Sequence, residues 1–314
     1  MKKIALFAAV ALCAGYVSVA SAHVPEGQLY TAFQWPDTHL PVLDGNLSEW
    51  DIVPSDYEIT LEDHVDANGE TDFNFASLNM RMIVSYNAND DKIYFMSERF
   101  DDYYDRNGQE GGAGGDDSWE MHHDGDHAGD DMWVSGDTFP DPDERALNMG
   151  RFAQTYHTRF PELPGSTGEG GATWAWFWVS QSTWHDSPQY MDYGFTIDGE
   201  INNGEATTFV EFNRVSWDEF LWNDEANSVI HDMVPEEIIG YGWQIVDHGT
   251  EDLDSCGENC PRSWYISGAA DAWRTAASAT DFLLAPLDPR VDFSSIPSAV
   301  EEASWGRIKE GFVK

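Results

Sequence analysis

The densest group of potential metal ligands lies in residues 120–131, whose sequence is EMHHDGDHAGDD. Ca²⁺ needs six to eight oxygen ligands, which a sharply bent, aspartate-rich backbone can supply. The segment therefore predicts a calcium site, although its spacing does not follow the twelve-residue helix-loop-helix pattern. An acidic loop exposed to solvent explains the same residues in a chain with 57 Asp and Glu. The calcium candidates are Asp124, Asp126, Asp130 and Asp131.

Histidines in the same segment raise a second possibility, because imidazole is a good ligand for zinc and copper. On a strand, His122 and His123 would point to opposite faces, so both could reach one ion only through a bulge. A further copper hypothesis concerns His23, which would become the N-terminal residue after cleavage of the leader described below. A terminal amine and an imidazole can chelate copper together.

A row of tryptophans stands in the segment TWAWFWV, residues 173–179. On a strand Trp174, Trp176 and Trp178 share one face. Exposed indole rings would form a platform for the C–H faces of sugars. A strand buried on both faces accounts for all seven residues and is favoured for that reason. Trp184, in a polar segment further on, is predicted to be a more exposed platform.

Cysteines and catalytic motifs give less information. Cys256 and Cys260 follow the leader and predict one disulfide closing a small loop in an oxidising compartment. The chain has no Gly-x-Ser-x-Gly, no Gly-x-x-x-x-Gly-Lys and no His-Glu-x-x-His motif. These observations favour a protein that is not an enzyme.

Charge and the N-terminal segment indicate the compartment. Residues 1–22 join two lysines, an apolar stretch and Ala20-Ser21-Ala22, which predicts a signal peptide cleaved after Ala22 and a secreted or periplasmic protein. The remaining chain has no stretch of about 20 apolar residues, so no membrane insertion is expected. The formal net charge of -41, with 16 Lys and Arg, argues against nucleic acid as a partner. It is typical of a salt-adapted (halophilic) protein.

Short alternating or apolar runs predict the elements that must position these residues. They occur at 29–35, 80–86, 92–98, 118–122, 173–179, 193–197, 207–212, 240–246 and 263–267. Such strands predict an all-β fold, an antiparallel sandwich of the jelly-roll or immunoglobulin-like kind. The sandwich is expected over residues 23–290, with an insertion at about 103–172 that carries a short helix near 144–156. A tail over 291–314 is expected to hold a short C-terminal helix.

Several motifs resemble those of family 9 carbohydrate-binding modules. They are PVLDGNLSEW at 41–50, DKIYFM at 91–96, DDSWEM at 116–121, FVEF at 209–212 and GYGWQIVD at 240–247. The resemblance covers residues 40 to 285 and implies a β-sandwich that binds polysaccharide and often holds structural calcium. The Trp-rich segment is also similar to a strand of periplasmic haem-binding sandwich subunits.

The function expected from these observations is a secreted, non-catalytic protein that binds polysaccharide or oligosaccharide and is stabilised by calcium. One alternative is a haem- or metal-binding sandwich in periplasmic electron transfer, in which Met or His would supply axial ligands. The other is an extracellular structural or surface-assembly protein.

Overall fold

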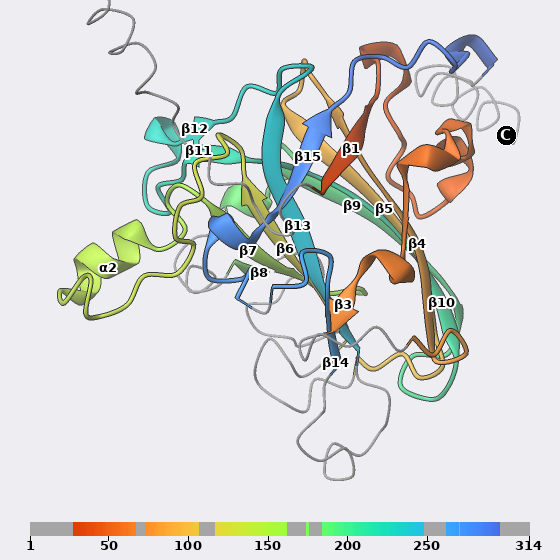
Figure 1. Ribbon diagram of the computed structural model, residues 1–314, viewed down its shortest axis with the longest axis horizontal. Helices are drawn as coiled ribbons and strands as arrows, with labels where there is room; N and C mark the ends of the chain where they lie inside the picture. Colours follow the sequence, from red (N-terminus) through yellow and green to blue (C-terminus); the bar gives the residue numbers. More distant parts are fainter. Residues whose placement is uncertain are drawn as a thin grey trace, which may run out of the picture.

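The computed structural model describes residues 28–66, 73–106, 117–161, 174–175, 184–247, 262–269 and 271–295 (Figure 1). The predicted signal peptide, both cysteines, Trp176, Trp178 and the C-terminal helix lie outside these residues. No helix of the described parts is long and apolar enough to cross a membrane.

Strands dominate the described chain. They are β1 (Leu29–Gln34), β2 (Glu58–Thr60), β3 (Val65–Asp66), β4 (Leu78–Asn87), β5 (Lys92–Asp101), β6 (Ser118–Asp124), β7 (Gln154–Thr158), β8 (Trp174–Ala175), β9 (Met191–Gly199), β10 (Ala206–Val215), β11 (Trp217–Glu219), β12 (Val229–Ile230), β13 (Ile238–Asp247), β14 (Arg262–Tyr265) and β15 (Thr280–Leu284). The one described α-helix is α2 (Pro142–Asn148), and short 3-10 turns connect several strands.

The strands form two packed sheets that share β1. Sheet A has the order β8-β7-β6-β13-β15, with β14 also beside β13 and β3 beside β14. Sheet B has the order β4-β5-β10-β9, with β2 beside β4. Residues 29–32 of β1 pair with β15 and residues 33–34 pair with β4. Figure 1 shows β1 lying between β15 and the long strands of sheet B. The all-β sandwich is confirmed, although β1 is parallel to both neighbours rather than antiparallel.

Alternating side chains of the two sheets meet in the core. Phe95 of sheet B contacts Trp119 and Trp243 of sheet A, with ring centroids 5.4 Å and 5.3 Å apart. A second apolar cluster covers part of the outer face of sheet B, where the segment before β2 packs Trp35 and Trp50 edge to face. Only part of that outer face is therefore left open to solvent.

The Asp-Gly motif at 44–45 and the later FVEF motif meet in the structure. The backbone N–H groups of Asp44 and Gly45 donate to Glu211 Oε2 at 3.2 Å and 2.9 Å, and Trp50 Nε1 donates to Glu211 Oε1 at 2.6 Å. Gly45 has φ of +80°, and a Cβ there would lie 2.6 Å from the carbonyl carbon of Phe195. Only glycine fits this close approach to β9. The Asp-Gly and FVEF motifs, which both resemble motifs of family 9 modules, are therefore held together by hydrogen bonds to Glu211.

The expected helix over 144–156 is wrong in its second half. Asp141 caps α2 by accepting from two backbone N–H groups, and the helix ends at Asn148. Gly150, with φ of +58°, turns the chain just after it, as glycine commonly does beyond a helix end. Residues 154–158 then form β7, which pairs with β6, so part of the predicted insertion belongs to sheet A.

Candidate functional site

Two Asp-x-Trp segments, 131–133 and 271–273, lie side by side at one end of sheet A. The N–H groups of Met132 and Trp133 both donate to the carbonyl of Arg274, at 2.9 Å and 3.0 Å. The first segment follows β6 and the second precedes β15. The end of β6 and the start of β15 flank the same part of β13, which brings the two loops together.

A surface hollow of about 270 Å³ lies between these loops. Half-buried Trp133 is its aromatic wall, and the exposed Arg274 guanidinium carbon lies 5.0 Å from the centre of the Trp133 ring. The same guanidinium lies 5.3 Å from the ring centre of Trp273. The lining residues are Asp131, Trp133, Val134, Ser135, Thr138, Asp271, Arg274 and Thr275.

This lining combines one flat apolar surface with many hydrogen-bonding groups. An indole offers rigid apolar area, while carboxylates, hydroxyls and a guanidinium present acceptors and donors around it. A polyol such as a sugar ring has both kinds of surface. Neither tryptophan was among the residues selected from the sequence, and the Asp-x-Trp pattern alone would not have marked them, because it also occurs at the buried Trp119.

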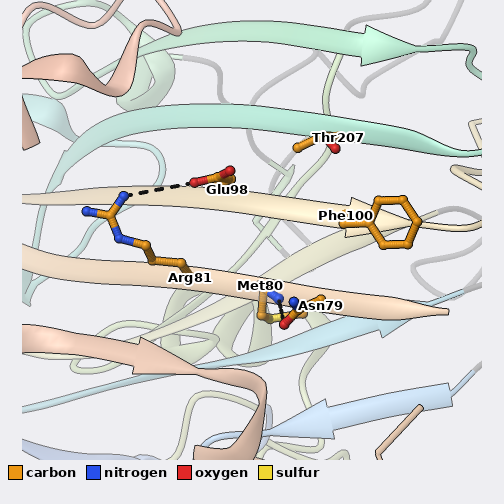
Figure 2. Close-up of a pocket in the computed structure, with 6 residues that line it drawn as sticks. All are labelled: Asn79, Met80, Arg81, Glu98, Phe100 and Thr207. Carbon is orange, nitrogen blue, oxygen red and sulfur yellow. Dashed lines mark hydrogen bonds and ion pairs between the residues drawn. The ribbon is translucent and has the colours of Figure 1, made fainter. Parts of the chain in front are cut away.

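A second, shallow groove of about 220 Å³ lies on the open part of sheet B (Figure 2). Its aromatic member is Phe100, and Arg81 crosses it from β4. Arg81 Nε lies 2.8 Å from Glu58 Oε1, and its terminal nitrogens lie 3.9 Å from Glu98 and from Asp51. The Arg81 cation already faces three carboxylates and is therefore less available to a ligand. For this reason the groove is less suited than the Trp133 hollow to bind a polar ligand.

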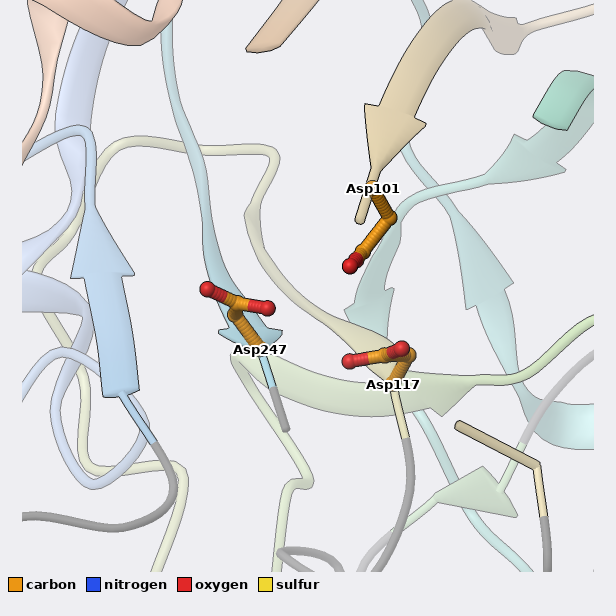
Figure 3. Close-up of side chains that lie close together, drawn as sticks. All are labelled: Asp101, Asp117 and Asp247. Atoms are coloured by element: carbon orange, nitrogen blue, oxygen red, sulfur yellow. The ribbon is translucent and has the colours of Figure 1, made fainter. Parts of the chain in front are cut away.

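Three buried aspartates from different elements point toward one another (Figure 3). Asp101 ends β5, Asp117 precedes β6 and Asp247 ends β13. One terminal nitrogen of Arg99 lies 2.5 Å from Asp101, 3.0 Å from Asp117 and 3.6 Å from Asp247. The guanidinium thus stands among the carboxylates where a metal ion would sit, and the group forms a buried ion-pair network.

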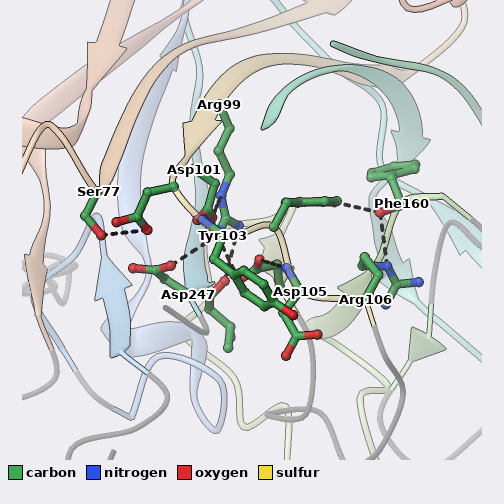
Figure 4. A network of polar contacts seen from close by, with 12 residues as sticks. Ser77, Arg99, Asp101, Tyr103, Asp105, Arg106, Phe160 and Asp247 are labelled. Carbon is green, nitrogen blue, oxygen red and sulfur yellow. Dashed lines mark hydrogen bonds and ion pairs between the residues drawn. The ribbon is translucent and has the colours of Figure 1, made fainter. Parts of the chain in front are cut away.

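That network continues into the adjoining loop (Figure 4). The N–H group of Asp105 donates to Asp117 at 2.6 Å, and the N–H group of Tyr103 donates to Asp101 at 3.0 Å. Arg106 Nε donates to the carbonyl of Phe160 at 3.0 Å. These contacts join the ends of β5, β6 and β7, so they hold sheet A and sheet B together at this end.

The predicted calcium candidates lie around the turn that follows β6. Asp124 Oδ2 accepts from the N–H group of Gly129 at 2.9 Å. Burial, and to a smaller extent the neighbouring Asp126, raises the pKa of Asp124 to about 7. The exposed Asp131 instead lines the Trp133 hollow. Within the described residues, only the Asp101, Asp117 and Asp247 group brings three ligand atoms within 4.8 Å of one another. Calcium at the turn has a suitable donor chemistry and stays a prediction.

The tryptophans that the sequence analysis selected as possible sugar platforms have different surroundings from one another. Trp184 is not an open platform: it is half-buried, packs against Trp217 and Phe220, and donates from Nε1 to the carbonyl of Trp222 at 2.9 Å. Trp174 pairs with His157 at the backbone in β8, whereas Trp176 and Trp178 are outside the described residues. Whether this row is a platform or core remains a matter of prediction.

His122 and His123 lie on opposite faces of β6. His123 is in the core, where its ring contacts Tyr156 and Tyr241 and its Nδ1 lies 3.0 Å from Ser216 Oγ. His122 faces the other way, toward Glu120. The two imidazoles therefore cannot bind one ion together.

No protein-family model and no curated protein matches the chain. Among solved structures, the chain is similar to a family 9 carbohydrate-binding module from Caldicellulosiruptor kristjanssonii in complex with cellotriose. The identity is 12%, the TM-score is 0.46, and the match covers 86% of this chain and 98% of the other. The same module in complex with glucose gives 12% identity and a TM-score of 0.47, covering 84% and 100%. These structures come from the family that the sequence motifs resemble.

Proposed function

We propose that this protein is a secreted, non-catalytic carbohydrate-binding β-sandwich whose binding site is the Trp133 hollow. The observation that carries the proposal is a half-buried indole surrounded by the carboxylates of Asp131 and Asp271, the guanidinium of Arg274 and several hydroxyl groups. The resemblance of the sequence motifs to family 9 modules points to the same ligand class. Secretion through the predicted leader is part of the proposal, and a mature chain starting at His23 would be seen by intact-mass measurement.

In this proposal a sugar ring packs its C–H face on Trp133, and its hydroxyls bond to the polar rim. Arg274 now lies over the indole. A cation–π contact of an exposed arginine contributes only about 0.5–1 kcal/mol, so a sugar can displace the guanidinium. Once displaced, Arg274 can donate to sugar hydroxyls from the rim.

The size of the hollow limits the ligand that it can enclose. At about 270 Å³ it lies just below the range of roughly 300–1,000 Å³ that is usual for small-molecule pockets. We therefore infer that one sugar unit enters the hollow and that the rest of an oligosaccharide or polysaccharide extends over the surface.

Substitution of the indole tests this site. We expect Trp133→Ala to weaken glycan binding at least tenfold, because the ring supplies the apolar contact area. Binding would be measured by calorimetry or affinity electrophoresis with a panel of soluble polysaccharides and cello-oligosaccharides. Phe152→Ala is the matched control, because Phe152 is 39% exposed and also lies beneath an arginine, Arg151, at 5.1 Å. Equal affinity in parent and Trp133→Ala would exclude the hollow as the site, and a parent that binds no glycan would overturn the proposed function.

A further inference from the structure

The charges around the Trp133 hollow are unevenly distributed. Two of its lining residues, Asp131 and Asp271, are exposed carboxylates, and Arg274 is its one cationic lining residue. The Arg274 guanidinium lies over the Trp133 ring, 5.0 Å from its centre. Among the described residues, it forms no ion pair with either carboxylate. The hollow therefore presents more negative than positive charge to a ligand.

The Asp271 carboxylate is held in place at the edge of the hollow. Its Oδ1 accepts a hydrogen bond from Ser278 Oγ at 2.8 Å. Its backbone carbonyl accepts from the N–H group of Arg274, also at 2.8 Å, which closes the turn that carries both residues. A carboxylate has about four lone-pair positions, so Asp271 can accept further hydrogen bonds from a ligand.

Asp131 stands on the facing loop and is positioned by backbone pairing. It forms an antiparallel bridge with Thr275, and the carbonyl of Asp130 accepts from the N–H group of Ala276 at 2.9 Å. Burial, and then the charges of Asp126 and Asp131, raise the pKa of Asp130. The electrostatic potential on this side of the hollow is therefore negative.

The face of Trp133 also attracts cations. An indole ring has a negative face that binds a cation within about 6 Å of the ring centre, and Arg274 is the cation that occupies it. A neutral sugar that displaces Arg274 would leave the indole and the two carboxylates of the hollow without a cation. A sugar that carries an ammonium group would replace one cation with another.

We propose that the Trp133 hollow selects a sugar with a free, protonated amino group, so that the ligand is a polysaccharide of amino sugars. This inference rests on the carbohydrate-binding function proposed above and names the class of its ligand. The ammonium group faces Asp131 and Asp271 while the ring packs on Trp133. The sugar hydroxyls bond to the side chains of Ser135 and Thr138 at the rim. The net charge of -41 acts in the same direction, because it attracts a polycation and repels uronate or sulfated glycans.

A comparison of glucosamine oligomers with N-acetylglucosamine oligomers of the same length tests the inference, because acetylation removes the positive charge and keeps the sugar ring. We expect the parent protein to bind the glucosamine oligomer at least tenfold more tightly. Affinities would be measured by calorimetry at mildly acidic pH, where the amine is protonated. EDTA excludes calcium, and 1 M NaCl shortens the screening length to about 3 Å, which largely removes attraction to distant charges.

Removal of the two carboxylates should abolish the preference. Asp131→Asn with Asp271→Asn keeps the side-chain shapes and the oxygen that accepts from Ser278, and it should weaken binding of the glucosamine oligomer at least tenfold. Asp137→Asn with Asp143→Asn is the matched control, because it removes the same charge from exposed residues that do not line the hollow. The control should bind the glucosamine oligomer like the parent. Thermal unfolding of both double variants shows that they are folded.

Three results would overturn the inference. If the parent binds N-acetylglucosamine or cello-oligosaccharides as tightly as glucosamine oligomers, the hollow does not select the amino group, and the proposed function still stands. An equal loss of affinity in both double variants would assign the preference to net charge. Oligolysine that binds as tightly as the glucosamine oligomer, with the same loss in Asp131→Asn with Asp271→Asn, would make the hollow a site for basic peptides. Absence of binding to every glycan would refute the proposed function itself, and this inference with it.

Discussion

Glu211 is a buried side chain that holds the Asp44-Gly45 turn and Trp50 in place. It accepts hydrogen bonds from Asp44, Gly45 and Trp50, yet burial raises its pKa to about 7, against the effect of those donors. The carboxylate is therefore easier to protonate in the folded chain than in the unfolded chain, where a glutamate has a pKa of about 4.3.

A pH dependence of stability follows from Glu211. Because its pKa is higher in the folded state, its contribution is fully present below about pH 4 and is lost as the pH rises to about 7, by roughly 3–4 kcal/mol. Glu211→Gln should remove this part of the decline. The free energy of unfolding at pH 5 and pH 8 would be compared with that of Glu98→Gln, whose side chain is 43% exposed. The same pH 5 to pH 8 decline in Glu211→Gln as in the control would contradict the assignment.

At the scale of elements, the turn after β6 gathers like charges. Burial and the neighbouring Asp126 raise the pKa of Asp124 to about 7, and burial together with Asp126 and Asp131 raises that of Asp130. A cation at the turn would relieve this repulsion. The calcium prediction therefore concerns the whole turn rather than any one carboxylate.

The calcium prediction is tested by thermal unfolding. We expect Ca²⁺ to raise the melting temperature of the parent protein above its value in EDTA, by the linkage of binding to folding. Asp124→Ala with Asp126→Ala should abolish the rise. Asp192→Ala with Asp198→Ala removes the same charge from exposed positions of β9 and should leave the rise intact. A Ca²⁺ response of equal size in both double variants would show that the turn is not the site.

At the scale of the whole molecule, the net charge of -41 opposes folding through self-repulsion. Screening shortens the range of this repulsion from about 10 Å at 0.1 M salt to about 3 Å at 1 M. We expect the melting temperature to rise over that interval in NaCl, with EDTA present to exclude calcium. KCl should give the same rise, since screening depends on ionic strength. A melting temperature that stays constant or falls in both salts would contradict salt adaptation.

The sequence by itself determined the features that depend on neighbours along the chain. Alternation of side chains marked β4, β5, β6, β10 and β13. The same local signals did not predict β7, because the residues that start a helix at Pro142 do not determine where the helix ends. The helix ends at Asn148, and the chain turns at Gly150. The local signals also missed β15, a five-residue strand that sheet A completes.

Only the tertiary structure decided the candidate sites. Trp133 and Arg274 meet because β6 and β15 flank β13. Trp184 was predicted to be exposed because its segment of the sequence is polar. In the structure its indole packs against Trp217. Side-chain alternation is a property of a few consecutive residues, whereas a binding site depends on which strands become neighbours, and that is settled when the whole core packs.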